Sequence, residues 1–183
     1  ILLEKERNPC HASVVNAGGI RRLNRSFAEI PISAAAAEMW PQLSKIVDDD
    51  CGFQPVGQVR IAPDRESMTF FRKRVGKVEE MGFFHEELVD ADEVKQLVPA
   101  YVGDCHGAIV TRSDGYALPA QTMKAFFNSA CSAGAKSFTR CKVTDISHEP
   151  GGFAILAEDG RLFRSEAVIN SSGAWAKSIA GFM

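Results

Sequence analysis

A run of small and polar residues near the end of the chain has the composition of a ligand-binding turn. Val168 and Ile169 are apolar and indicate a short strand, and the sequence Asn170-Ser171-Ser172-Gly173-Ala174-Trp175 follows. Because Gly173 has no Cβ and the serines are short, the backbone N–H groups here can approach a phosphate or a ribose closely. A tight strand-to-helix turn in which Trp175 only packs has the same composition, so both interpretations stay open from the residues alone.

The start of the chain carries a second signal of nucleotide binding. The apolar residues Ile1-Leu2-Leu3 end at Glu4, and charged sequence follows. In dinucleotide-binding folds, an acidic residue at the end of the second strand accepts hydrogen bonds from a ribose hydroxyl. Glu4 stands at such a position, although an ordinary surface strand can also end in a charge.

A third segment, residues 12–22, combines two glycines with two arginines. Gly18 and Gly19 permit close approach of the backbone to a flat ligand, and Arg21 and Arg22 supply positive charge for an anion. The alternative is a helix end followed by a loop with solvated arginines.

These three segments, in this order and spacing, resemble the FAD-dependent amine and amino-acid oxidoreductases, a family that includes D-amino acid oxidase, glycine oxidase and sarcosine oxidase. The resemblance implies an α/β fold: a partial FAD-binding Rossmann-like domain with an inserted antiparallel-sheet substrate domain. It implies hydride transfer from the carbon next to an amine to the flavin. The FAD contacts that it implies are Glu4, Ser13, Asn16, Ala17, Gly18, Gly19, Val143, Ser172, Gly173 and Trp175.

The resemblance also bears on how the flavin is held. In the dimethylglycine and sarcosine dehydrogenase branch, a histidine of the small-residue stretch binds the flavin covalently, and this chain has Asn16 there. The resemblance therefore implies noncovalent FAD.

Catalytic side chains are not identifiable, because a neutral amine can give up hydride without an acid/base pair. Arg60, His106 and Arg112 are candidates for binding a substrate carboxylate, with ordinary sheet-surface polarity as the alternative. His11, just before the flavin loop, has a surface role as its simpler interpretation.

Residue periodicity predicts an alternation of helices and strands. Apolar spacing and turn signals predict strands over 51–62 (as an antiparallel pair), 87–89, 107–112, 137–146, 153–157 and 162–169. Helical spacing predicts helices over 28–46 with a break at Pro41, 65–81 after the cap Asp64, 119–133 before Gly134, and a short one after Asp90 or Asp92. With the resemblance, this order predicts an FAD domain in two parts, 1–50 and 119–183, around a substrate-domain insert at 51–118.

The pyrophosphate-binding turn of this fold is absent from the sequence. No G-x-G-x-x-G occurs in the 183 residues, and the first residue is Ile1. We therefore expect an internal piece of a longer enzyme, inactive alone.

Composition excludes several other classes of protein. The net charge is −2 and basic residues form no patch, so nucleic acid is not expected as a partner. The five cysteines are scattered and form no cluster with histidines, so neither a metal site nor a disulfide scaffold is expected. With no transmembrane stretch or signal peptide, we expect a cytoplasmic protein; peripheral membrane association, homo-oligomerisation and the electron acceptor stay open.

The leading hypothesis is an FAD-dependent oxidoreductase that acts on an amino acid or a secondary amine. Two alternatives stay open: an FAD-dependent 2-hydroxy-acid dehydrogenase, which would use the same flavin geometry, and a non-catalytic flavin-fold subunit or remnant.

Overall fold

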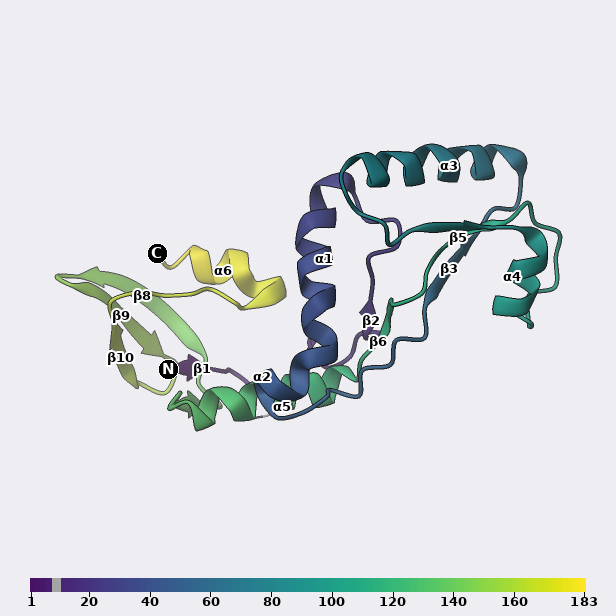
Figure 1. Cartoon of the computed structure of the whole chain (residues 1–183). Coiled ribbons are helices and arrows are strands. Elements are labelled where there is room, and N and C mark those ends of the chain that lie inside the picture. The colour runs from purple at the N-terminus through teal and green to yellow at the C-terminus, as the bar shows by residue number, and fades with distance from the viewer. Residues whose placement is uncertain (8–10) are drawn as a thin grey trace. The chain divides into compact units, whose positions relative to one another are not determined.

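The computed structural model describes residues 1–7 and 11–183, which fold into two compact units of mixed helix and sheet (Figure 1). The first unit contains Ile1–Asn16 and Phe126–Met183, and the second contains Ala17–Ala125. The predicted insert, 51–118, falls wholly within the second unit, together with 17–50 and 119–125. Compactness does not assign function, so the three-part division into FAD and substrate domains stays a prediction.

Two sheets form the first unit. Strands β8 (Val143–Glu149), β9 (Gly152–Ala157) and β10 (Leu162–Ser165) form an antiparallel sheet in the order β10-β9-β8. Strand β1 (Leu2–Leu3) pairs in parallel with β7 (Ser137–Phe138). The short helices η3 (Gly173–Trp175) and α6 (Ala176–Ala180) follow near the C-terminus (Figure 1).

Two of the predicted strands in this unit are longer than the observed ones. The strand predicted over 137–146 is interrupted at 139–142, because Arg140 has φ +49°, which is outside the extended region of the backbone. The N–H groups of Arg140 and Cys141 bond to the carbonyls of Glu6 and Glu4, just after β1. The strand predicted over 162–169 ends at Ser165, whose hydroxyl donates to the carbonyl of Ala167 (2.7 Å) and turns the chain. Residues 168–169 are therefore not part of a strand.

A three-stranded sheet with a helix on each face forms the core of the second unit. Strands β3 (Gln58–Ile61), β5 (Ala108–Thr111) and β4 (Glu87–Val89) are antiparallel in the order β3-β5-β4. Helix α3 (Arg65–Glu80) packs Met68, Phe71 and Val75 against Ile109. Helix α4 (Ala91–Leu97) packs Val94 against Ala108 and Val110, which point to the opposite face because side chains alternate along a strand (Figure 1).

The caps of these helices follow the predictions. The carboxylate of Asp64 accepts the N–H of Ser67 (2.7 Å) at the start of α3. Asp90, and not Asp92, caps α4, because its carboxylate accepts the N–H groups of Asp92 and Glu93.

The helix predicted over 28–46 is divided into shorter helices, and the predicted break at Pro41 is confirmed. It consists of η1 (Phe27–Glu29), α1 (Ile30–Met39), η2 (Trp40–Gln42) and α2 (Leu43–Val47). Pro41 has no N–H to donate within a helix, and the turn around it is a 3-10 helix. Helix α5 (Pro119–Ser132) stops before Gly134, which has φ +96°.

The strand pair predicted within 51–62 is wrong. Only β3 is a full strand, and it pairs with β5, whereas Gln54 forms an isolated bridge to Tyr116. Tyr116 belongs to β6 (Gly115–Tyr116), which pairs antiparallel with β2 (Gly19–Ile20). The two halves of 51–62 thus bond to different segments, with Pro55 and Gly57 (φ +81°) between them.

Across the described ranges, 1–7 and 11–183, no helix has the length and apolar character that a membrane span requires.

Candidate functional site

Glu4 lies at the carboxyl end of a parallel strand, where nucleotide-binding acids are found in dinucleotide folds. Its N–H donates to the carbonyl of Phe138 (2.9 Å), which extends the β1–β7 pairing by one residue. The half-buried carboxylate accepts the N–H of Glu6 at Oε1 (2.9 Å). An ionised carboxylate has about four acceptor positions, so this bond leaves capacity for a ribose hydroxyl.

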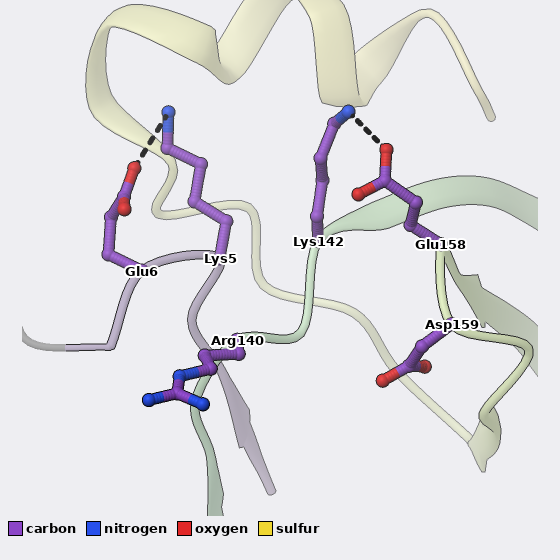
Figure 2. Close-up of a pocket in the computed structure, with 6 residues that line it drawn as sticks. All are labelled: Lys5, Glu6, Arg140, Lys142, Glu158 and Asp159. Atoms are coloured by element: carbon purple, nitrogen blue, oxygen red, sulfur yellow. Dashed lines mark hydrogen bonds and ion pairs between the residues drawn. The ribbon is translucent and has the colours of Figure 1, made fainter.

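An open cavity of about 500 Å³ lies beside Glu4 and is lined entirely by charged residues (Figure 2). The residues that line it are Lys5, Glu6, Arg140, Lys142, Glu158 and Asp159. The ammonium of Lys142 lies 2.6 Å from a carboxylate oxygen of Glu158, and that of Lys5 lies 3.8 Å from Glu6. Figure 2 shows Lys5 and Lys142 extending in the same direction, each beside its carboxylate.

This cavity connects two segments that the sequence assigned separately to the nucleotide. Lys5 and Glu6 follow Glu4, and Lys142 precedes Val143, the first residue of β8. Sequence reasoning missed the lining charges. Lys5, Glu6 and Lys142 could have been found from their positions beside Glu4 and Val143, whereas Glu158 and Asp159 had no such signal.

The pKa values of one group that lines the cavity, Asp159, and of one buried group beside it in the chain, Cys141, are shifted. Hydrogen bonds from Arg161 lower the pKa of the Asp159 carboxyl, which keeps it ionised. Burial raises the pKa of the Cys141 thiol, which keeps the thiol neutral and a poor nucleophile.

The turn at 170–176 is built around the side chain of Asn170. Its Oδ1 accepts from the N–H (3.2 Å) and the hydroxyl (2.7 Å) of Ser172, and its Nδ2 donates to the carbonyl of Ala176 (2.8 Å). Gly173 has φ +57°, and a Cβ added there would meet no atom of the described residues within 4 Å beyond its chain neighbours. The turn therefore presents Gly173 to open space.

Trp175 brings the last segment against the first. The Lys5 ammonium lies 3.4 Å from the centroid of the indole ring, and the His11 ring centroid lies 4.6 Å away. The predicted nucleotide segments at both ends of the chain are therefore together in the first unit.

The small-residue stretch shows different roles for its two glycines. Gly18 has φ +67°, and a Cβ there would lie 2.0 Å from the carbonyl oxygen of Ala117, so the pairing of β2 with β6 requires glycine. A Cβ on Gly19 would meet no atom of the described residues within 4 Å, which leaves space for a ligand. In the first unit, Ser13 is exposed, and the Asn16 amide donates to the carbonyl of Ala12 (2.8 Å).

The three candidate substrate residues do not converge on one pocket. Arg60 lies on β3, with its guanidinium 5.5 Å from the ring centroid of Phe71. Arg112 follows β5 and lies 2.6 Å from Glu93 and 2.9 Å from Glu87, and its hydrogen bonds to Glu93 and then Glu87 raise its pKa.

The exposed His106 precedes β5, and Arg112 follows it. The prediction that both residues lie on this strand is therefore wrong. His106 and Arg112 flank opposite ends of β5, and Arg60 packs on the other face of the sheet from Arg112. Of the two arginines after β2, Arg22 is paired with Asp114 (3.3 Å), whereas Arg21 is exposed.

A model of the FAD-dependent oxidoreductase family matches residues 1–183. Among curated relatives, N-methyl-L-tryptophan oxidase from Escherichia coli (strain SMS-3-5 / SECEC) is 23% identical over 184 residues, which cover 98% of this chain and 48% of the relative. The chain therefore spans about half the length of the curated relatives that it matches.

Solved structures of similar fold include several oxidoreductases. Glycine oxidase from Geobacillus kaustophilus has a TM-score of 0.86 at 22% identity, and the match covers 98% of this chain and 50% of the oxidase chain. L-proline dehydrogenase from P. horikoshii also has a TM-score of 0.86 at 22% identity, with 98% and 47% covered. L-α-glycerophosphate oxidase from Mycoplasma pneumoniae, solved with FAD bound, has a TM-score of 0.79 at 17% identity, with 99% and 49% covered. At these identities the likeness establishes the fold, and it confirms the predicted Rossmann-like class.

Proposed function

The chain belongs to the FAD-dependent oxidoreductase family, and from that membership we propose that the protein oxidises an amino acid or a secondary amine, with FAD as hydride acceptor. N-methyl amino acids, glycine-like primary amines and cyclic secondary amines all fall in this substrate class. They share a carbon that carries both a hydrogen and an amine nitrogen. The names of the relatives, an N-methyl-L-tryptophan oxidase, a glycine oxidase and a proline dehydrogenase, support this class.

The observation that carries the proposal is the convergence of three distant segments in the first unit. Glu4 offers acceptor oxygens at a strand end, the neighbouring cavity is bordered by Lys142 just before Val143, and the turn at Gly173 leaves open space. The open Cβ position at Gly173 is what a closely approaching cofactor requires, so the residues present fit an FAD nucleotide.

Different residues are proposed to contact different parts of FAD. We assign the adenosine ribose to Glu4, the adenine to the backbone at Val143, and contacts nearer the flavin to Ser172 and Gly173. In the second unit, Gly19 has the clearance to face a flat ring system, whereas Gly18 maintains the strand pairing.

When bound, FAD supplies the electron chemistry of this family. The chain's residues bind the cofactor, orient it and exclude water. Because Asn16 stands where a covalent histidine is found in one branch, we propose that FAD is held noncovalently. The amide of Asn16 is not a nucleophile, and it donates to the carbonyl of Ala12.

The alternative, hydride transfer from a carbon that carries a hydroxyl, as in 2-hydroxy acids, is supported by one comparison, and only at the level of the bond that is oxidised. The glycerophosphate oxidase named above has the same fold, and glycerophosphate carries hydroxyl groups and no amine. The second alternative, a non-catalytic flavin-fold subunit, has no comparable support.

The test uses the protein expressed from the whole coding sequence. We expect a yellow protein whose flavin absorbance bleaches anaerobically with an amino acid or an N-methyl amino acid, and much more slowly with 2-hydroxy acids of matched side chain. Acid precipitation should leave the flavin in the supernatant. Bleaching by hydroxy acids alone would favour the alternative, a protein purified without flavin would contradict the proposal, and flavin in the pellet would contradict noncovalent binding.

A further inference from the structure

Two buried carboxylates hold the chain just after strand β2. Asp114 is 1% exposed and Glu86 is 3% exposed. The Oδ2 atom of Asp114 accepts the backbone N–H groups of Arg22 (2.7 Å) and Leu23 (2.8 Å). The Oε1 atom of Glu86 accepts the N–H of the next residue, Asn24, at 2.7 Å. Three consecutive N–H groups of this turn therefore donate to carboxylates of residues that are far away in the sequence.

Each buried carboxylate also has an arginine partner. The Nε atom of Arg22 lies 3.3 Å from Oδ1 of Asp114, and its Nη2 donates to the hydroxyl of Ser113. Arg74 binds Glu86 through two nitrogens, at 2.9 and 2.8 Å. An unpaired buried charge is costly, and these arginine partners compensate the two buried carboxylates. Hydrogen bonds from backbone N–H groups to charged acceptors are stronger than those to neutral ones.

Strand β2 needs such an anchor because it is very short. It has two residues, and its partner β6 also has two. A pairing of this length is not stable by itself. Asp114 lies directly before Gly115, the first residue of β6, and its carbonyl accepts the N–H of Gly57 (2.7 Å). The residue that anchors the end of β2 is thus also joined to the start of its partner strand.

We infer that Asp114 is a positioning residue: it holds the end of β2 through the backbone of Arg22 and Leu23, and thereby sets where the Gly18–Gly19 segment meets the flavin. This role rests on the proposed function, which places that segment beside the cofactor. Asp114 touches neither cofactor nor substrate in this role. It acts through the strand.

The test is Asp114→Asn in the whole protein loaded with FAD. The amide keeps the size of the side chain, but it is a weaker acceptor and places an N–H₂ group near the Arg22 guanidinium. We expect hydrogen exchange in a peptide covering residues 18–24 to become about tenfold faster or more, the scale of a lost charged hydrogen bond. Single-turnover flavin reduction should slow by a similar factor, while FAD content stays within about twofold of wild type.

The matched control is Asp64→Ala, which removes the cap of α3 and so destabilises the same unit at another place. The two variants are compared under conditions in which their Tm values match. If Asp114→Asn and the control then show the same hydrogen exchange at residues 18–24 and the same rate of flavin reduction, the positioning role is overturned. If Asp114→Asn does not fold, the double variant Asp114→Asn with Arg22→Met removes the unpaired guanidinium and allows the same measurements. Wild-type exchange and reduction in that variant would also overturn the role.

The two proposals can fail separately. A wild-type protein without flavin contradicts the proposed function. The exchange comparison, which needs no flavin, would then still decide whether Asp114 anchors β2.

Discussion

The carboxylate of Glu4 is already bound to the N–H of Glu6, so a ribose would have to share it. Glu4→Gln keeps the size of the side chain and one acceptor oxygen, but it removes the charge. We expect FAD affinity to fall by roughly 1–3 kcal/mol, the range for a hydrogen bond to a charged group. Fluorescence titration of FAD into the apoprotein measures this change.

Glu149→Gln is the control for this substitution, because Glu149 ends β8 and pairs with Arg164 (2.8 Å). It should leave FAD affinity unchanged. Equal FAD affinities in both variants and wild type would show that Glu4 does not bind the ribose and only stabilises the turn at Glu6.

Gly173 allows a sharper test, since the chain contains a glycine in the same situation. Gly173 (φ +57°) and Gly160 (φ +86°) both have left-handed backbones, and an added Cβ at either meets no atom of the described residues within 4 Å. Valine at each position therefore brings a similar backbone strain without a steric clash. We expect Gly173→Val to abolish FAD retention and Gly160→Val, in the β9–β10 turn, to keep it.

Flavin content per protein after gel filtration, alongside the Tm of each variant, measures this difference. Normal FAD content in Gly173→Val would show that the turn serves the fold only.

His85, in the connection between α3 and β4, should make the stability of the second unit depend on pH. Burial is the main cause that lowers the pKa of His85, with Arg22 and Arg74 adding to it and Glu86 and Asp114 opposing it. The Nε2 atom is buried without a hydrogen-bond partner among the described residues. Protonation is therefore harder in the folded chain than in the unfolded chain.

The sign of the effect follows from linkage. A group with a lowered folded pKa contributes stability above its unfolded pKa, about 6.5 for histidine, and that stability is lost as the pH falls further. We expect Tm to decline as the pH drops from about 6.5 toward 5, above the range where carboxylates titrate. His85→Gln should flatten this decline, and His148→Gln, at an exposed site, should not. The same decline in both variants would contradict this assignment.

The 183 residues include Glu4, the proposed ribose contact, but no G-x-G-x-x-G turn. The N–H groups and dipole at a helix N-terminus are what neutralise a pyrophosphate in dinucleotide folds. We expect these 183 residues, expressed alone, to purify colourless and without amine-dependent reduction of an electron acceptor. A visible spectrum and an FAD titration, beside the product of the whole coding sequence, measure this. Submicromolar FAD binding by the shorter chain would contradict the prediction.

Local structure could be predicted wherever a helix boundary depends on neighbouring residues. Asp64, Asp90, Pro41 and Gly134 each act on backbone groups within a few positions, so their effects appear in the sequence itself. Strand partners were harder to predict. The segment 51–62 alternates like a hairpin, yet its pairing partners lie in β5 and β6, about fifty to sixty residues away.

The sequence by itself determined the family, the FAD nucleotide as the expected ligand, and Glu4 and Gly173 as candidate contacts, because these signals are residue types in a fixed order. Only the tertiary structure decided which charged groups pair with one another and which of them line a cavity. Arg112 is paired with glutamates of β4 and α4, and Arg22 with Asp114, whereas Lys5 and Lys142 line one cavity with their carboxylates. Ion pairing depends on distance in space, and no local pattern encodes the distance between residues that lie some ninety positions apart.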